Sequence, residues 1–552
     1  MLGLMMDRSL QISRLIDHAA LWHADVEIVT LRTGAPDVRG TYRELRARSA
    51  QLAHALTQRL HVEPGDRVGT FAWNSQRHLE LYYGVSGSGV VLHTINPRLF
   101  AQQIVYVMNH ARDRFVFVDA DLVPVLEPLA AQVPGVEGYV VLCDEAAMPA
   151  TSLPNAVAYE TLIAGMPDDI TWPELDERTA SSLCYTSGTT GNPKGVLYSH
   201  RSTLLHAFAQ AASWQAGPGS QAAILPVVPL FHANAWGLPY LAPMQGSKLV
   251  FADPHLDPAG LYDAFEREQI TLTCGVPTIW LRLLEYLERN DLRFSSLKLL
   301  GVGGAAPPRA MIEAFEVKYG VCVMNAWGMT ETSPACTVGL PKPQHDVMPQ
   351  RIEYKTRAGR CLFGVDMRIV DDDGAPLPFD GVAQGEIHVR GPWIASSYFE
   401  DDDATARGIT EDGWLRTGDI ATIDADGYVM IRDRAKDVIK SGGEWISSID
   451  LENVAVAHPA VAEAAAIGVP HPTWSERPVL FVVAKQGQAL DAPSVLAFLD
   501  GKVAKWWLPD EVRVVAELPH TATGKVSKRT LRERYAAEVG GESAVGYVEP
   551  TA

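Results

Sequence analysis

One loop concentrates the residues of this chain that are best suited to bind phosphate. It runs from Tyr185 to Gly195 and reads Tyr-Thr-Ser-Gly-Thr-Thr-Gly-Asn-Pro-Lys-Gly. Glycines let backbone N–H groups approach phosphate oxygens closely, hydroxyl groups add hydrogen-bond donors, and lysine adds positive charge. Apolar residues flank the loop on both sides, so we expect it to lie between two extended segments. The pattern predicts a polyphosphate cradle made by Thr186, Ser187, Gly188, Thr189, Thr190, Gly191 and Lys194.

The loop differs from a Walker A loop, which needs two glycines with four residues between them, followed by Lys and then Ser or Thr. Here Lys194 stands between Pro193 and Gly195. The other candidate, Gly524–Val526, lacks the magnesium-binding hydroxyl and the upstream glycine. The pattern therefore argues against a P-loop nucleotide hydrolase.

The loop resembles the phosphate loop of the adenylate-forming superfamily, which contains acyl-CoA synthetases, luciferases and the adenylation domains of peptide synthetases. Further segments resemble motifs of that family, in its usual order and over nearly the whole chain: Pro229–Trp236, Gly303–Pro307, Trp327–Thr332, Trp414–Asp419, Arg434–Trp445 and Thr523–Lys525. Two stretches, Ser181–Ser202 and Asn96–Phe100, are most similar to bacterial medium-chain fatty acyl-CoA ligases and 3-methylmercaptopropionate-CoA ligases.

This resemblance implies an ATP-dependent acyl-CoA ligase that uses ATP, Mg²⁺ and coenzyme A. A small carboxylic acid would attack the α-phosphate of ATP to give acyl-AMP and pyrophosphate, and CoA would then take the acyl group and release AMP. The acid would be a medium-chain fatty acid or 3-methylmercaptopropionate. Bringing two anions together requires cations and oriented donors more than a nucleophilic side chain.

The resemblance also assigns residues to the adenylation step. Lys525 would bridge the carboxylate and the α-phosphate, and Thr330 would face the α-phosphate. Glu331 would bind Mg²⁺, with Thr186 as a second candidate contact. Hard oxygen ligands that are few in number suit Mg²⁺, because this ion shares its coordination with phosphates and water.

Nucleotide recognition needs a flat surface for the base and acceptors for the ribose hydroxyls. By the resemblance, Trp327 would stack on adenine, Asp419 would bind the ribose and Arg434 would assist it. The neighbouring wall and strand would be made by Gly303, Gly304, Ala305, Ala306, Pro307, Asn325, Ala326 and Gly328.

On the acyl side, the resemblance places Trp236 as the gate of an acyl tunnel and His232 beside the carboxylate and the thiol path. The role of His232 stays open: it could be a general base for the thiol, a residue that positions groups by hydrogen bonding, or a gate. A free thiol near pH 8 needs only modest help to react. The acid would contact His232, Ala233, Trp236, Gly304 and Pro334.

Thiol transfer would require a second arrangement of the chain. The resemblance implies a C-terminal domain that rotates about a hinge at Lys436 and brings a glycine-rich segment to the site in place of Lys525. An exposed charged residue can absorb a large change in φ and ψ without loss of packing. The CoA contacts would be Lys436, Lys440, Gly442, Gly443, Glu444 and Trp445.

Composition narrows the functional class further. The formal charge of −19 argues against binding to nucleic acid or to anionic membranes. No stretch of about 18 apolar residues occurs, and the N-terminus lacks the pattern of a secretory signal, so we expect no membrane span and a cytoplasmic location. The six cysteines form no Cys-x-x-Cys pair, which fits neither a disulfide framework nor a zinc site.

The elements that must position these residues alternate between helix and strand patterns. Segments such as Ser49–Leu60 predict amphipathic helices, and Arg67–Ala72 or Phe115–Asp119 predict buried strands. We therefore expect an α/β fold of layered subdomains in a large N-terminal domain, residues 1–434, with a β-rich subdomain at residues 359–432. Residues 435–552 would form the small, mobile α+β C-terminal domain.

Three alternatives remain at this stage. The chain could be a long-chain fatty acyl-CoA synthetase, since the motifs do not measure the depth of the acyl pocket. It could load a carrier protein as a fatty acyl-AMP ligase, although the glycine-rich CoA segment is intact. A non-catalytic acyl or nucleotide sensor would be expected to have lost Lys525 or Glu331, and both are present. Related ligases also imply a homodimer.

Overall fold

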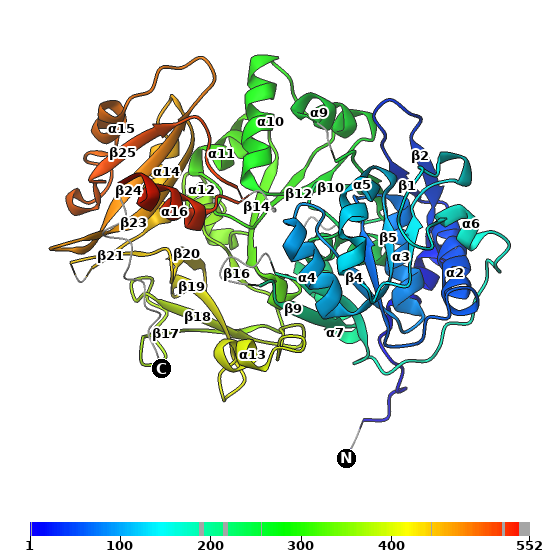
Figure 1. The fold of residues 1–552 in the computed structure, drawn as a ribbon. Coiled ribbons are helices and arrows are strands. Elements are labelled where there is room, and N and C mark those ends of the chain that lie inside the picture. The colour runs from blue at the N-terminus through cyan, green and yellow to red at the C-terminus, as the bar shows by residue number, and fades with distance from the viewer. Residues whose placement is uncertain are drawn as a thin grey trace.

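A computed structural model describes residues 1, 3–186, 192–213, 219–254, 257–442, 444–520 and 525–539. Its strands form two large and two small sheets covered by helices, which confirms the α/β class (Figure 1). None of the helices in these ranges is long and apolar enough to cross a membrane.

The first large sheet has seven strands and carries the phosphate loop. In spatial order they are β7 (Val157–Ala158), β6 (Gly138–Val141), β5 (Asp113–Val118), β3 (Arg67–Phe71), β4 (Val91–Thr94), β8 (Ala180–Tyr185) and β9 (Gly195–Ser199). All neighbours are parallel except β8 and β9, which pair antiparallel with Tyr185 opposite Gly195. The expectation that two extended segments bracket the loop is thus confirmed.

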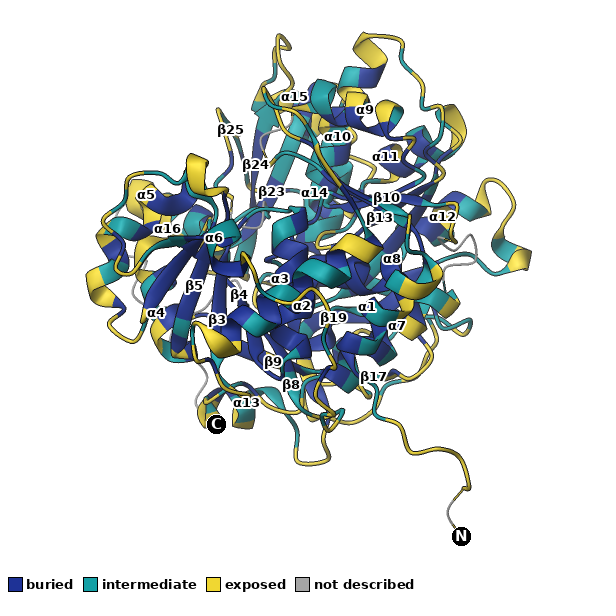
Figure 2. Cartoon of the chain, turned by 90° about the vertical axis from the view of Figure 1, so that its right-hand side faces the viewer, coloured by how far each residue is buried: buried dark blue, intermediate teal, exposed yellow. Residues whose placement is uncertain are grey.

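The second large sheet has nine strands with a parallel centre. In spatial order they are β16 (Arg360–Cys361), β15 (Ala335–Gly339), β14 (Cys322–Gly328), β13 (Leu299–Val302), β12 (Leu272–Gly275), β10 (Ala223–Pro226), β11 (Lys248–Phe251), β1 (Glu27–Thr30) and β2 (Val38–Thr41). Figure 2 shows that the central strands of these sheets are buried beneath the helices.

Helices fill the layers between and around the two large sheets. They are α1 (Ile12–Trp22), α2 (Tyr42–Gln58), α3 (Gln76–Gly87), α4 (Ala101–Ala111), α5 (Val123–Leu126), α6 (Tyr159–Ile163), α7 (His200–Ser213), α8 (Leu238–Gln245), α9 (Pro258–Arg267), α10 (Pro277–Arg289), α11 (Arg309–Glu313) and α12 (Gln350–Thr356). Thr41 caps α2 and Ser75 caps α3 by accepting backbone hydrogen bonds, which explains why those helices begin there.

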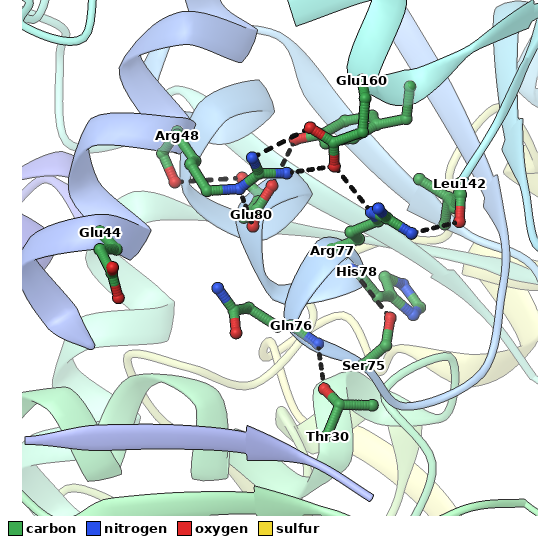
Figure 3. Close-up of polar contacts among 12 residues, drawn as sticks. Thr30, Glu44, Arg48, Ser75, Gln76, Arg77, His78, Glu80, Leu142 and Glu160 are labelled. Carbon is green, nitrogen blue, oxygen red and sulfur yellow. Dashed lines mark hydrogen bonds and ion pairs between the residues drawn. The ribbon is translucent and has the colours of Figure 1, made fainter. Parts of the chain in front are cut away.

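A partly buried ion network, the Arg48 network, joins α2, α3 and α6 around the fully buried Glu80 (Figure 3). Arg48 reaches Glu80 at 2.6 Å and Glu160 at 2.7 Å, and Arg77 pairs with Glu160 at 2.9 Å. The Tyr159 hydroxyl donates to the second oxygen of Glu80 at 2.7 Å. Since every charge has an opposite partner, the network holds three helices in one arrangement without leaving an unpaired ion inside.

The chain then forms two small sheets. The four antiparallel strands β17 (Asp366–Val370), β18 (Gly385–Arg390), β19 (Leu415–Ile423) and β20 (Val429–Arg434) come first, with α13 (Asp402–Gly408) beside them. The last sheet orders β22 (Glu444–Ile446), β21 (Ile439–Ser441), β24 (Ser475–Ala484) and β23 (Val461–His471), with β25 (Glu511–Val515) paired to β24. Helices α14 (Ser448–Val456), α15 (Ala492–Leu499) and α16 (Lys528–Val539) pack with it at the end of the molecule remote from α2 (Figure 1).

Candidate active site

A cavity of 2840 Å³ opens where the large sheets meet the C-terminal elements. It brings together most of the residues that the sequence predicts for the site. Its lining includes Thr186, Lys194, His232, Ala233, Trp236, Gly303, Gly304, Ala305, Ala306, Asn325, Ala326, Trp327, Gly328, Thr330, Glu331, Pro334, Asp419, Arg434, Lys436 and Lys525.

The topology explains why these distant residues meet. Strand β8 ends at Tyr185 just before the phosphate loop, β10 ends at Pro226 before Pro229–Trp236, and β13 ends at Val302 before Gly303. Parallel strands end at a common edge of their sheet, and ligands of open α/β sheets bind outside that edge. The cavity therefore lies where the fold class alone favours a binding site.

The carboxylate of Asp419 is held from two sides. Trp327 donates its indole N–H to one oxygen at 2.7 Å, and Arg434 approaches the other at 2.6 Å. Asp419 and Arg434 face each other in the β19–β20 pairing, so the ion pair follows from the strand register. Asp419 raises the pKa of Arg434 and keeps the guanidinium charged. These contacts fix an acceptor beside an aromatic surface, as ribose and base recognition require.

Glu331 is anchored by a residue that the sequence did not reveal. The Tyr398 hydroxyl donates to one Glu331 oxygen at 2.8 Å, and the Lys194 ammonium lies 4.8 Å from the centre of the Tyr398 ring. The Tyr198 hydroxyl also holds the backbone of Thr330, at 2.6 Å from its carbonyl oxygen. Tyr398 lies outside every motif, and its local sequence carries no signal for this role. It connects the phosphate-loop lysine to the predicted magnesium ligand.

Lys525 reaches into this cavity from the C-terminal part of the chain. Its side chain approaches Gly304 so closely that a Cβ atom on that glycine would lie 3.3 Å from Lys525 Cε. Gly304 also has a φ of 80°, which other residues rarely adopt. Burial, together with the positive charge of Arg434, lowers the pKa of Lys525 to about 8. The cation thus lies where an anionic ligand would restore its usual pKa.

His232 precedes an unusual backbone turn. Residues Ala233, Asn234, Ala235 and Trp236 all have positive φ, from 43° to 56°. Left-handed backbone costs about 1–2 kcal/mol per residue, so the surroundings must hold it. The Asn234 amide donates to Ser182 Oγ at 3.0 Å, and the Gln210 amide donates to the Trp236 carbonyl oxygen at 2.8 Å.

This turn aims Trp236 at the wall of the cavity. A side chain on Gly303 would come within 3.2 Å of the Trp236 ring, so the glycine leaves the space that the indole fills. Burial, and secondarily the charge of Lys525, lowers the pKa of His232 to about 4. His232 is therefore neutral near pH 7 and is a weak proton acceptor in this arrangement.

Some predicted residues lie elsewhere. Pro307 is buried and, like Lys440, Gly442 and Trp445, does not line the cavity. The Asn325 amide donates to the carbonyl oxygens of Thr356 and Arg357 at 3.2 and 2.9 Å, so its side chain is occupied by the fold. Ser187, Gly188, Thr189, Thr190, Gly191 and Gly443, and the side chain of Glu444, lie outside the described residues.

The segment around the predicted hinge is a turn in this arrangement. Lys436 is exposed, and the backbone N–H groups of Asp437 and Val438 both donate to the Arg434 carbonyl oxygen. Arg532 of α16 contacts the Lys436 carbonyl oxygen at 3.4 Å and pairs with Asp437 at 2.8 Å. The C-terminal helix thus contacts the residues at which the chain leaves β20.

Few described side chains are placed to bind a metal ion. Within the described ranges, no group of three or more His, Cys, Asp or Glu side chains is placed to hold an ion. One oxygen of Glu331 accepts from Tyr398, and no hydrogen bond among the described residues uses the other. A single carboxylate suits Mg²⁺ that keeps several waters and phosphate oxygens, and it does not suit an all-protein cage.

Comparison with known proteins agrees with this geometry. Residues 16–399 match the AMP-binding enzyme family, and residues 450–525 match the AMP-binding enzyme C-terminal domain. The chain is 49% identical to a 3-methylmercaptopropionyl-CoA ligase of Ruegeria lacuscaerulensis, covering 97% of this chain and 99% of the relative. It is 45% identical to a medium-chain-fatty-acid–CoA ligase of Ectopseudomonas oleovorans, covering 97% and 98%.

A solved structure shares the same fold. An anthranilate CoA ligase in complex with anthranoyl-AMP superposes with a TM-score of 0.87 at 24% identity, covering 97% of this chain and 99% of that one. This superposition confirms the predicted fold, and the matches to the family models and to the two ligases confirm the family resemblance of the motifs.

Proposed function

We propose that this chain, which belongs to the AMP-binding enzyme family and is an acyl-CoA ligase, activates a medium-chain fatty acid or 3-methylmercaptopropionate in two alternating half-reactions. The two relatives described above are named for these acids. The observation that carries the proposal is the position of Lys525 beside Gly304, because it unites the C-terminal segment with the cavity wall in an arrangement suited to adenylation.

In the first half-reaction, a carboxylate oxygen of the acid attacks the α-phosphorus of ATP. The new acyl–O–P bond forms as the bond between the α-phosphorus and the bridging oxygen breaks, and pyrophosphate leaves. Lys525 neutralises the approaching carboxylate and the α-phosphate, while Lys194 and its loop hold the outer phosphates. Positioned cations and donors of this kind supply most of the stabilisation in phosphoryl-type transfers.

Asp419 and its two partners, Trp327 and Arg434, hold the nucleoside end of ATP. Asp419 accepts from the ribose hydroxyls, and Trp327 offers its indole face to adenine while its N–H keeps Asp419 oriented. Glu331, with Thr186 nearby, would hold Mg²⁺. When bound, this ion supplies charge neutralisation across the phosphates. Tyr398 keeps the Glu331 carboxylate turned toward that position.

The second half-reaction requires the C-terminal domain, residues 435–552, to rotate against residues 1–434 at Lys436. The CoA sulfur then attacks the acyl carbon, the acyl–O bond breaks, and AMP leaves. Lys440, Gly442, Gly443, Glu444 and Trp445 would then line the thiol path. Of these, Lys440, Gly442 and Trp445 do not line the cavity in the present arrangement. Because His232 is a weak proton acceptor, we assign it to positioning the carboxylate and thiol, not to general-base catalysis.

A pyrophosphate-release assay tests this function. It uses carboxylates from propionate to palmitate together with 3-methylmercaptopropionate, each with and without CoA. We expect the highest kcat/KM for medium-chain acids or for the sulfur-containing acid, and acyl-CoA formation only when CoA is present. A preference for palmitate would contradict the substrate class, and turnover that needs a carrier protein in place of CoA would contradict the acceptor.

We also propose a homodimer in the cytoplasm, on the strength of the family resemblance. Light scattering after size exclusion should give twice the chain mass of 60.1 kDa. A mass equal to one chain would contradict the dimer.

A further inference from the structure

The two described ends of the phosphate loop are held by side chains that take no direct part in the proposed reaction. Tyr185 and Gly195 face each other in the β8–β9 pairing, and the Thr186 N–H donates to the Lys194 carbonyl oxygen at 2.9 Å. The Phe399 N–H donates to the Gly195 carbonyl oxygen at 2.8 Å. A Cβ atom on Gly195 would lie 3.3 Å from Tyr185 Cζ and 3.1 Å from Phe399 Cβ. The Tyr185 ring and Phe399 therefore fix where the loop begins and ends.

His110, in the last turn of α4, holds the Tyr185 side chain. Its Nδ1 atom and the Tyr185 hydroxyl oxygen share a hydrogen bond of 2.7 Å. Burial raises the pKa of Tyr185, so the phenol keeps its proton. The His93 ring also lies beside the phenol, with ring centres 5.0 Å apart, but its Nδ1 atom pairs with the buried Asp113 at 2.8 Å. Among the described residues, His110 is thus the only hydrogen-bond partner of the Tyr185 hydroxyl.

The same end of α4 holds the segment that leads to the predicted metal ligand. The His110 ring packs edge-on against Phe399, with ring centres 5.7 Å apart. Arg112, which caps α4, pairs with Glu400 at 2.6 Å. Phe399 directly follows Tyr398, whose hydroxyl anchors the predicted magnesium ligand. One helix end therefore sets the start of the phosphate loop relative to the segment that carries Tyr398.

We propose that His110 is a positioning residue for the adenylation step. Neither His110 nor Tyr185 lines the cavity, so both act on the substrate through the residues that they hold. By fixing Tyr185 and Phe399, His110 sets the position of Lys194 relative to Glu331, and with it the fit of the outer phosphates of ATP. Small displacements of positioned charges cost much of their effect on phosphoryl-type transfers.

The inference rests on the proposed two-step function and adds a residue that serves only its first step. During thiol transfer the bound nucleotide is the AMP part of acyl-AMP, which has only an α-phosphate. The phosphate loop then has no outer phosphates to hold. Loss of the His110 contact should therefore impair adenylation and spare thiol transfer.

Two substitutions of His110 separate its hydrogen bond from its ring contact. His110→Phe keeps an aromatic ring beside Phe399 but removes the partner of the Tyr185 hydroxyl, whereas His110→Asn keeps a polar atom close to the position of Nδ1. The matched control is His345→Phe. His345 is also half-buried and stacked on a tyrosine, Tyr354, with ring centres 3.8 Å apart, and it does not line the cavity.

Pyrophosphate–ATP exchange measures the effect on the first step. We expect His110→Phe to raise the KM for ATP and for pyrophosphate by about 5- to 50-fold, because the Tyr185 hydroxyl loses its partner and the loop is displaced. His110→Asn should recover part of this loss, and His345→Phe should leave both KM values unchanged. Thiol transfer from supplied acyl-AMP should stay near the unsubstituted rate in His110→Phe. Unchanged KM values, or equal loss in both half-reactions, would overturn the proposal.

A double substitution tests whether the two residues act as a pair. Tyr185→Phe should raise the KM for ATP as His110→Phe does, and the variant with both changes should be no worse than the more severe single variant, since one hydrogen bond is lost in all three. Effects that multiply would show that His110 acts without Tyr185 and would also overturn the proposal. Absence of exchange in the unsubstituted enzyme would instead contradict the proposed function itself.

Discussion

The Arg48 network and the cluster around Asp419 both place several charges inside the protein, yet they satisfy them differently. Burial alone would lower the pKa of Arg48, but Glu80 and Glu160 outweigh it and raise that pKa. In the cavity, Arg434 and Lys525 approach the same region, and burial with mutual repulsion lowers the pKa of Lys525 to about 8. Charges neutralised by protein partners hold the fold, whereas a cation made less stable by its surroundings gains most from an anionic ligand.

The largest effect on activity is expected for a substitution in the cavity. Lys525→Ala should reduce acyl-AMP formation by about 10²- to 10³-fold, because one positioned donor to the transition state is lost. Thiol transfer from supplied acyl-AMP should remain near the unsubstituted rate, since Lys525 leaves the site before that step. Pyrophosphate–ATP exchange and acyl-CoA formation measure the two halves, with the exposed Lys485→Ala as control. Equal loss of both halves would contradict domain alternation.

On the fold side, Arg48→Met should act on stability alone. Removing one partner of a buried pair leaves uncompensated charge on Glu80 and should cost about 3–5 kcal/mol of unfolding free energy. Chemical denaturation should register this loss, while the KM for ATP stays unchanged because Arg48 does not line the cavity. The control Arg43→Met lies on the same helix and breaks only an exposed pair with Asp25, which should cost little. An altered KM for ATP in Arg48→Met would contradict the view that the Arg48 network stabilises the fold and takes no part in ligand binding.

The lowered pKa of Lys525 predicts an alkaline limb in the adenylation rate. The charged form is the active one, so kcat/KM for the acid should fall by about tenfold per pH unit as pH rises above about 8. Lys525→Arg should move this limb to higher pH, since a guanidinium stays charged. The measurement is a pH profile of pyrophosphate release. A limb at the same pH in both proteins would belong to another group.

The smallest effect is expected at the gate. Trp236→Ala removes the indole that lies against Gly303 and should shift the preferred acid toward longer chains, with changes in relative kcat/KM of about tenfold or less. The carboxylate panel measures this shift, and the control is Trp22→Ala, because Trp22 is exposed and does not line the cavity. An unchanged chain-length profile would remove Trp236 from the gate and leave it as a packing residue.

Sequence patterns predicted the local elements well where their signal was strong. The strand predicted at Arg67–Ala72 is β3, that at Phe115–Asp119 is β5, and the helix predicted at Ser49–Leu60 forms the later part of α2. Apolar periodicity identifies such elements because burial repeats along one face. The start of α2 at Tyr42 was not predicted, although its cap at Thr41 could have signalled it.

The site was predicted where its residues belong to motifs and was missed where contacts come from isolated side chains. Thr330, Glu331, Asp419 and Lys525 all line the cavity, and the roles predicted for them stay predictions. Tyr398 was missed, because a tyrosine outside a motif is indistinguishable from a core residue until its hydroxyl is seen to reach Glu331. The left-handed turn at Ala233–Trp236 was equally hidden, since these residue types give no warning of positive φ.

By itself, the sequence determined the family, the reaction class and the residue types that ATP, CoA and a carboxylate require, because those are carried by contiguous motifs. The tertiary structure decided which of them meet: Lys525 with Gly304, Tyr398 with Glu331, and His110 with Tyr185. These partners lie on different elements, many of them far apart in the chain, and their contact depends on strand order, register and domain placement. Such long-range geometry is set by packing of the whole fold, which no local pattern of residues encodes.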